Sequence, residues 1–322
     1  MSSHEAPDTI PAGIFLEDAP CPCGCPPGDE PVLSGGDRLN GLPGHFSVVK
    51  CRTCGLKRTN PRPDAASIGY FYPTDYDPYK QSMVTPSPAR KRGWRGLAHS
   101  FFDSRSTILP HTEPGRMLEI GCAAGANLQL MASRGWEVTG LEPSSEAAEF
   151  ARSRGFEVAN CELEAASYAD QSLDLILGWM VMEHLHDPVA CLEKMHHWLR
   201  PDGWLAFSVP NAGSYEFNLF GDAWFALQLP THLFHYDPPS LETVLNKAGW
   251  RLDRVFFQRN NSNLVYSLGY KCRDWGWRRL GDYLVKGSLQ YSLPFRLLTY
   301  PYAWLASRFG SAGRMTVWAR KA

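Results

Sequence analysis

Two carboxylates and a glycine-rich turn are the first residues of this chain with the spacing of a ligand site. Glu119 precedes the turn Gly121–Gly125, and Glu142 lies roughly 20 residues beyond it, where a carboxylate takes the two ribose hydroxyls of a nucleoside. The turn lacks the Lys-Ser or Lys-Thr of a P-loop, and Ala126 stands where a dinucleotide fold has its third glycine. Glu119 would repel a pyrophosphate but suits a cationic amino group and a sulfonium. These residues favour S-adenosylmethionine as the ligand.

Five of the nine cysteines fall near the start of the chain, as Cys21, Cys23 and Cys25, followed by Cys51 and Cys54. Two clusters at this separation, the second being C-x-x-C, are typical of a zinc site. The irregular first cluster leaves a choice of ligands. We favour Cys21, Cys23, Cys51 and Cys54, with Cys25 as a substitute for either early ligand, and the alternative is reduced cysteines without metal. Four thiolates leave no open coordination position, so the zinc would be structural.

Histidines that could serve as a general base occur in two segments. "MEHLHDP" supplies Glu183, His184 and His186, and "LPTHLFHYDPP" supplies His232, His235 and Tyr236. A neutral histidine suits a base that works near pH 7. His184 is the first choice for a catalytic residue and His232 the second, with Tyr236 as a third candidate. A hydrogen-bonded structural role is the alternative for each histidine.

The chain alternates strands and helices from about residue 115, and this alternation predicts a doubly wound α/β fold. One run, 173–180, is continuously apolar, which is typical of a strand buried on both faces. Ligands of such sheets bind at the carboxyl ends of the strands, which places Glu119 and Glu142 in one site. Strands are expected at 116–122, 136–144, 156–160, 173–180, 204–211, 250–258 and 314–321, with helices at 127–135, 144–155, 188–203 and 240–249.

Four motifs in order, "LEIGCAAG", "GLEPS", "MEHLHDP" and "LRPDG", resemble the class I S-adenosylmethionine-dependent methyltransferases over residues 115 to 260. The resemblance implies a seven-stranded, mostly parallel, Rossmann-like sheet. It also implies that Gly121 and Gly125 approach the methionine part, that Glu142 binds the ribose, and that His184 faces the substrate. Ala123 departs from the glycine that the family often has. The implied cofactor-binding residues are Glu119, Gly121, Cys122, Ala123, Gly125, Glu142, Pro143, Glu162, Leu163 and Met180.

The cysteine clusters, followed by "GLKRTNPRP" and a tyrosine-rich stretch, resemble the zinc-binding region ahead of some bacterial small-molecule methyltransferases. Many of these act on sugars or other secondary metabolites. The aromatic and basic segment 261–312 can pack over the acceptor pocket as helices, or lie in a membrane interface. We therefore expect a tail at 1–20, a zinc module at 21–62, a helical linker at 63–112, a cofactor-binding core at 113–260, a helical acceptor lid at 261–312, and a final strand at 313–322.

The bulk properties narrow the choice of partners. The net charge is −1, so no overall attraction to nucleic acid is expected. No apolar run reaches the ~18 residues of a membrane span, and the first residues do not resemble a secretory signal, so we expect a cytoplasmic enzyme. The leading prediction is methylation of a small molecule at carbon, oxygen or nitrogen. The alternatives are an RNA methyltransferase, disfavoured by the few basic residues in 1–60, a non-catalytic binding protein, and a nicotinamide oxidoreductase, disfavoured by Glu119.

Overall fold

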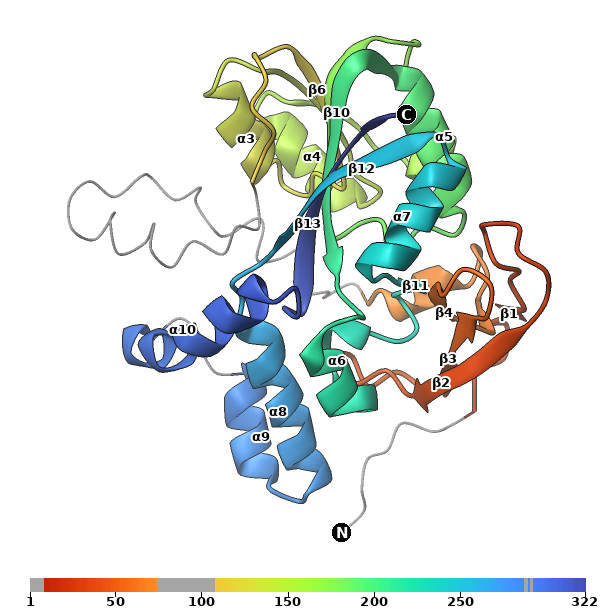
Figure 1. Ribbon diagram of the computed structural model, residues 1–322, viewed down its shortest axis with the longest axis vertical. Coiled ribbons are helices and arrows are strands. Elements are labelled where there is room, and N and C mark those ends of the chain that lie inside the picture. Colours follow the sequence, from red (N-terminus) through yellow and green to blue (C-terminus); the bar gives the residue numbers. More distant parts are fainter. Residues whose placement is uncertain (1–8, 74–107, 287–288, 290–291) are drawn as a thin grey trace.

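The computed structural model describes residues 9–73, 108–286, 289 and 292–322, and a seven-stranded sheet forms its centre (Figure 1). The strand order is β12-β13-β10-β9-β6-β7-β8. Strands β10, β9, β6, β7 and β8 run parallel, while β13 is antiparallel to both of its neighbours. The predicted doubly wound, mostly parallel, seven-stranded sheet is thereby confirmed. The strands are β6 (Arg116–Ile120), β7 (Glu137–Leu141), β8 (Glu157–Ala159), β9 (Leu173–Trp179), β10 (Leu199–Pro210), β12 (Trp250–Phe257) and β13 (Arg314–Lys321).

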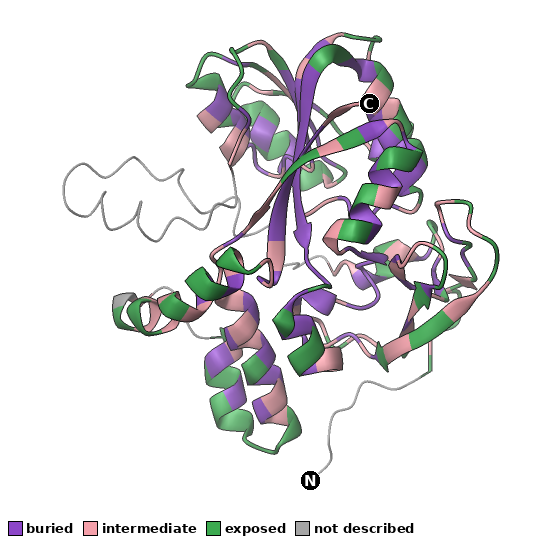
Figure 2. Cartoon of the chain, in the orientation of Figure 1, coloured by how far each residue is buried: buried purple, intermediate pink, exposed green. Residues whose placement is uncertain are grey.

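Helices cover both faces of this sheet, which explains the apolar character of its middle strands. In β9, Leu175 and Leu177 belong to one core cluster and Ile176 to the other, because successive side chains point to opposite faces. Helices α3 and α4 contribute to the first cluster, and α5 and α7 to the second. Figure 2 shows the resulting burial along the central strands. The helices are α3 (Ala126–Ala132), α4 (Ser145–Ser153), α5 (Pro188–Trp198) and α7 (Pro238–Lys247).

Local signals set the ends of these helices. The side chains of Ser144 and Asp187 each accept a hydrogen bond from a backbone amide in the first turn of α4 and α5, as N-caps do. The sequence predicted that α5 would continue through "LRPDG", but it ends at Trp198 and β10 begins at Leu199. Pro201 disfavours helical backbone in the residue before it, which accounts for the correction.

The N-terminal module is a small antiparallel sheet in the order β11-β4-β3-β2, with a separate pair of short strands, β1 and β5, beside it. Its fourth strand, β11, comes from the segment between β10 and α7, far along the chain (Figure 1). The module and the core therefore share a sheet, which the sequence did not indicate. The strands are β1 (Leu16–Glu17), β2 (Asp29–Gly35), β3 (Phe46–Cys51), β4 (Lys57–Thr59), β5 (Arg62–Pro63) and β11 (Phe234–His235).

The segment predicted to be a helical lid contains α8 (Ser262–Asp274), α9 (Arg278–Lys286) and α10 (Leu293–Arg308), with α6 (Tyr215–Phe220) beside α8. Helices α8 and α9 pack side by side beyond the end of the sheet (Figure 1). None of the described helices is long and apolar enough to cross a bilayer. Most of the predicted linker at 63–112 lies outside the described residues. Short 3₁₀ helices complete the described chain: η1 (Ile68–Phe71), η2 (Leu163–Ala165), η3 (Gly221–Ala223) and η4 (Phe225–Leu227).

Candidate functional site

The turn between β6 and α3 has a backbone that favours glycine. The φ angles of Gly121, Ala123 and Gly125 are 67°, 45° and 75°, all in the left-handed region. A Cβ at Gly121 would lie 2.8 Å from Cγ2 of Val181, and one at Gly125 would lie 3.0 Å from Cδ2 of Phe156. The two glycines therefore permit close packing as well as the backbone conformation. Ala123 adopts this conformation at a cost of about 1 kcal/mol. The approach of the turn to a methionine chain stays a prediction.

Glu142 ties this turn to the end of β7. Its Oε2 accepts a hydrogen bond from the Ala123 amide at 2.8 Å, and its Oε1 accepts one from the Ser144 amide at 2.9 Å. Each carboxylate oxygen has a second lone pair, so both can still accept a ribose hydroxyl. Asn160, which sequence reasoning missed, donates from Nδ2 to the carbonyl oxygens of Glu142 and Pro143 at 2.8 and 2.9 Å. Its place directly after β8 is the signal that could have identified it.

Glu119 is a buried carboxyl group with one oxygen to spare. Its Oε1 accepts a hydrogen bond from Nδ2 of Asn127 at 3.0 Å, while its Oε2 has no partner among the described residues. Burial raises the pKa of Glu119 to about 8, and the negative charge of Glu142 adds to this shift. Such a group is stabilised by a cation, because the positive charge offsets the cost of burying the ionised carboxylate.

The other predicted cofactor residues differ in how they could contact a ligand. The side chains of Cys122 and Leu163 are buried in the two core clusters. Pro143 and Glu162 are exposed beside the ends of β7 and β8. Met180 directly follows β9, is half-buried, and has a φ of 59°, which is uncommon for a residue with a side chain. Contact between these residues and a cofactor stays a prediction.

The two predicted catalytic histidines lie together, with ring centroids 4.7 Å apart and planes at 83°. The Nδ1–H of His184 donates to the carbonyl of Thr231 at 2.9 Å, and the hydroxyl of Tyr72 lies 2.8 Å from the same nitrogen. The Nδ1–H of His232 donates to the carbonyl of Ala226 at 2.8 Å. Because a carbonyl only accepts, both rings carry their proton on Nδ1, and the lone pair is on Nε2.

Burial lowers the pKa of His184 to about 4 and that of His232 well below its usual value. Both imidazoles are therefore neutral at pH 7, which is the form that accepts a proton or ligates a metal. Their low pKa also makes them weak bases.

Tyr236, the third predicted catalytic residue, lies in the hydrophobic core instead. Its side chain is fully buried, and its ring stacks on Phe234 with centroids 6.0 Å apart. Its hydroxyl donates to the carbonyl of Met182 at 3.2 Å. This packing gives Tyr236 a role in the core, because the backbone already uses its donor, and a catalytic role for Tyr236 stays a prediction.

Glu183 lies next to the histidine pair, and its place in "MEHLHDP" does not by itself predict a role. It is completely buried, and neither carboxylate oxygen has a hydrogen-bond partner among the described residues. Burial raises its pKa to about 8, partly offset by the positive charge of Arg314 at the start of β13. Its carboxylate and one nitrogen each of His184 and His232 lie within 4.8 Å of one another.

The N-terminal module holds the segment that carries His232. The hydroxyl of Thr59, in β4, donates to the carbonyl of His232 at 2.7 Å and accepts from Nε2 of His235 at 3.1 Å. The amide of Thr59 donates to the carbonyl of Leu233 at 2.9 Å. The pairing of β4 with β11 extends this contact. The position of one catalytic candidate therefore depends on the small sheet at the start of the chain.

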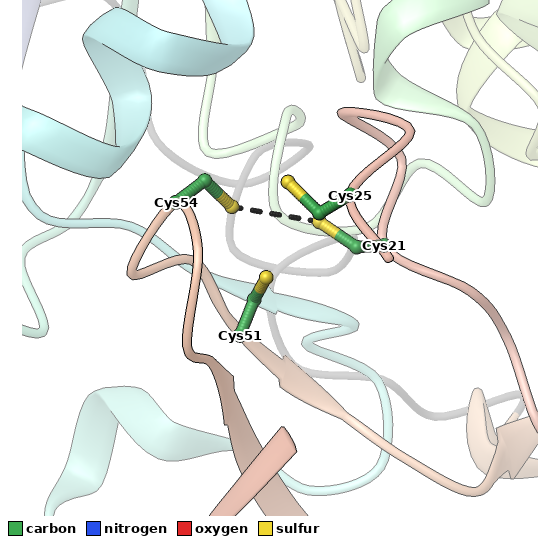
Figure 3. A group of neighbouring side chains, drawn as sticks. All are labelled: Cys21, Cys25, Cys51 and Cys54. Carbon is green, nitrogen blue, oxygen red and sulfur yellow. Dashed lines mark hydrogen bonds between the residues drawn. The ribbon is translucent and has the colours of Figure 1, made fainter. Parts of the chain in front are cut away.

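Four of the N-terminal cysteines bring their sulfur atoms together, but the set differs from the prediction by one residue (Figure 3). Cys21, Cys25, Cys51 and Cys54 have Sγ atoms within 4.8 Å of one another, and the sulfurs of Cys21 and Cys54 are 3.5 Å apart. Cys23 is outside this set. It remains next to Cys21, and hydrogen bonding from it is the main influence that lowers the pKa of Cys21 to about 4.

Tight turns explain which cysteines meet. The amide of Gly24 donates to the carbonyl of Cys21 at 3.0 Å, and this turn brings Cys25 back toward Cys21. Gly55 has a φ of 75°, and its amide donates to the carbonyl of Cys51 at 2.9 Å. Zinc–sulfur bonds of about 2.3 Å place tetrahedral sulfurs about 3.8 Å apart, so the cluster fits a zinc ion with little rearrangement.

Comparison with known proteins gives a consistent result. Residues 93–255, more than half of the chain, match the family described as "Methyltransferase domain". The ubiquinone biosynthesis O-methyltransferase of Aromatoleum aromaticum is 28% identical over 217 residues, which cover 58% of this chain and 92% of that protein. The enzyme of the same name from Nitrosospira multiformis is 28% identical over 203 residues, covering 54% and 85%. A solved S-adenosylmethionine dependent methyltransferase from Mesorhizobium loti aligns with a TM-score of 0.45 and 15% identity, over 72% of this chain and 100% of that one.

The match to the family covers the strands from β6 to β10, the turn at Gly121 and both carboxylates described above. The chain therefore belongs to the methyltransferase domain family and is a class I S-adenosylmethionine-dependent methyltransferase.

Proposed function

We propose that this enzyme methylates an oxygen atom of a small-molecule acceptor. The observation that carries the proposal is a contact between two parts of the site. The cofactor half is the region around the turn at Gly121, and the acceptor half is the region around Glu183 and the two histidines. Gly121, in the cofactor turn, packs so closely on Val181 that a Cβ at Gly121 would lie 2.8 Å from Cγ2 of Val181. Val181 is followed two residues later by Glu183 and then by His184. His184 thus lies on a loop that touches the turn expected to hold the cofactor, and His232 packs against His184 from another segment.

The identity of the relatives supports oxygen as the acceptor atom and a small molecule as the substrate. Those reported above are named as O-methyltransferases of ubiquinone biosynthesis. A neutral imidazole with its lone pair on Nε2 can take the proton of a hydroxyl group. We also propose that the enzyme acts in the cytoplasm and that the described helices of segment 261–312 cover the acceptor pocket.

In the proposed reaction, the cofactor supplies a methyl group on a positively charged sulfur. Glu142 orients the cofactor by accepting its ribose hydroxyls, and Glu119 pairs with its amino group. His184 accepts the hydroxyl proton of the acceptor on Nε2, with His232 as the alternative. The acceptor oxygen then uses a lone pair to form the new bond to carbon, and the electrons of the broken carbon–sulfur bond stay on sulfur.

We also propose that Cys21, Cys25, Cys51 and Cys54 bind a structural zinc ion. Four thiolates fill its coordination sphere, so it takes no part in the chemistry. Its role is to join the turn before β2 to the turn after β3 and, through β4 and β11, to hold the segment that carries His232.

The first experiment is calorimetric titration of the purified protein with S-adenosylhomocysteine, with zinc quantified on the same sample. We expect binding in the micromolar range that is lost, by on the order of 100-fold, in Glu142→Ala, because two charge-assisted hydrogen bonds to ribose contribute about 1.5–3 kcal/mol each. Glu149→Ala, which changes an exposed glutamate of α4, is the matched control and should bind normally.

Equal binding by Glu142→Ala and the wild type would contradict the assigned role of Glu142. Methylation assays on hydroxyl-bearing and amine-bearing acceptors then test the acceptor atom. Transfer to amines alone would contradict the proposal of oxygen.

A further inference from the structure

Glu183 is a buried acid that the proposed function leaves without a task. It is fully buried at the carboxyl edge of the sheet, and neither oxygen of its carboxylate has a hydrogen-bond partner among the described residues. Arg314 is near enough to attract it, yet the described residues include no ion pair between the two. A buried carboxylate is stable only with a compensating partner. Among the described residues, Glu183 thus has an attracting charge in Arg314 but no direct partner for its oxygens.

Two histidines, His184 and His232, lie next to the carboxylate of Glu183. Ligand atoms of Glu183, His184 and His232 lie within 4.8 Å of one another, although the third comes from a different segment of the chain. Backbone carbonyls accept the Nδ1–H of both rings, so both lone pairs are on Nε2. A histidine that ligates a metal is usually oriented by such a hydrogen bond from its other nitrogen. Each ring therefore keeps one nitrogen with a lone pair, as ligation requires.

The arrangement differs from the cysteine cluster in a way that matters for chemistry. Four cysteines close the coordination sphere of a metal, whereas two imidazoles and one carboxylate leave positions open. Two nitrogens and one oxygen suit a divalent ion of the first transition series. Glu183 and His184 lie on the loop that packs against the cofactor turn, through Val181 and Gly121, and His232 reaches them from the segment before β11.

We propose that Glu183, His184 and His232 bind a divalent cation whose open positions take oxygen atoms of the acceptor. This proposal deepens the proposed function and rests on it. The two histidines here ligate the cation, so the hydroxyl proton passes to solvent instead of to His184. A bound cation lowers the pH at which a hydroxyl loses its proton. The proton passes to solvent, a lone pair of the oxygen forms the bond to the methyl carbon, and the electrons of the carbon–sulfur bond stay on sulfur. The acceptor class is a molecule with a hydroxyl group that can ligate a metal.

The test is titration of the zinc-loaded protein with Mn²⁺, followed by the electron paramagnetic resonance signal of the free ion. Mn²⁺ prefers oxygen and nitrogen ligands, so it leaves the thiolate site alone. We expect one Mn²⁺ to bind per chain, and binding to weaken at least tenfold in Glu183→Gln and in His232→Gln. Glu216→Gln is the matched control. It removes another buried carboxyl, bonded instead to the hydroxyl of Tyr302 at 2.8 Å and absent from the cluster, and should bind Mn²⁺ normally.

Titration of the same samples with S-adenosylhomocysteine separates the two proposals. Normal cofactor-product binding by Glu183→Gln also shows that this nearly isosteric variant is folded. A wild-type protein that binds S-adenosylhomocysteine but no Mn²⁺, or a Glu183→Gln variant that binds Mn²⁺ as well as wild type, overturns the metal site and leaves the methyltransferase proposal intact.

Discussion

The cofactor half and the acceptor half of the site are built in different ways. The proposed cofactor half comes mainly from one stretch, Glu119 to Leu163, with Met180 added after β9, and its residues lie at or directly after the ends of strands. The acceptor half is assembled from separate parts of the chain, with Tyr72, Glu183–His184, Thr231–His232 and Arg314 meeting at one edge. Because the residues of the cofactor half adjoin their strands in the sequence, they take their positions as those strands form. The assembled half depends on every segment that contributes, including a module far away in the sequence.

This difference predicts that damage to the zinc module affects the two halves unequally. In Cys51→Ser, we expect loss of zinc and a fall in methyl transfer on the order of 100-fold, as for a displacement of about 1 Å at a reacting group. The physical reason is that Thr59 and β11 would no longer hold the segment of His232 in place. Binding of S-adenosylhomocysteine should stay within a few-fold of wild type. Zinc analysis, a methyl-transfer assay and calorimetry measure the three quantities.

Cys23→Ser is the control for that prediction, because Cys23 lies beside the sulfur cluster without belonging to it. This variant should keep its zinc and its activity. Equal zinc loss in both variants would mean that Cys23 is a zinc ligand. A loss of cofactor binding in Cys51→Ser as large as its loss of methyl transfer would show that the cofactor half and the acceptor half are not independent.

A second prediction concerns the electrostatics of the cofactor half alone. The pKa of Glu119 is raised to about 8, so in the free protein the carboxyl group is mostly protonated at pH 6. Pairing with a cationic amino group requires the ionised form, and binding must then release a proton. The affinity for S-adenosylhomocysteine should therefore rise with pH below 8, by up to about tenfold per pH unit.

Calorimetry between pH 6 and 7.5 measures this dependence. Glu119→Gln should show a weaker affinity that does not change over this range, while Glu149→Gln, on the exposed face of α4, should behave as wild type. A wild-type affinity that is flat across the range would mean that Glu119 does not pair with the ligand.

The same division explains what could be predicted from the sequence. Periodic apolar runs, capping residues and turn glycines act locally, so the strands, α4 with its Ser144 cap, and Glu142 at the end of β7 could all be located. Even there, the pattern predicts α5 too long, because Pro201 disfavours helical backbone in the residue before it.

The acceptor half was predictable only in part, since its geometry depends on tertiary contacts. "MEHLHDP" and "LPTHLFHYDPP" indicated His184 and His232, but nothing in the sequence showed that the two rings would meet. The burial of Tyr236, the pairing of β11 with β4, and the exchange of Cys25 for Cys23 all follow from how distant segments pack. Spacing between cysteines does not reveal which side chain a turn directs toward the metal.

The smallest expected effect concerns the outer surface of the lid helices, beside the acceptor half. Large apolar side chains are exposed there, among them Trp275 and Trp277 at 60% each and Leu298 at 77%. We predict that this surface rests on membrane lipid, which provides a place for apolar side chains without a spanning helix. Flotation with anionic liposomes should recover the wild-type protein. Leu298→Ser should bind about fivefold more weakly, because half-burying one leucine contributes about 1 kcal/mol.

Leu219→Ser is the matched control for flotation, because Leu219 is 52% exposed on α6, outside the segment 261–312. It should float as the wild type does. If the wild type does not float, or both variants lose binding equally, the apolar lid surface has no membrane role. Its helices would then matter to the enzyme through their inner contacts, such as the hydrogen bond from Tyr302 in α10 to Glu216 in α6.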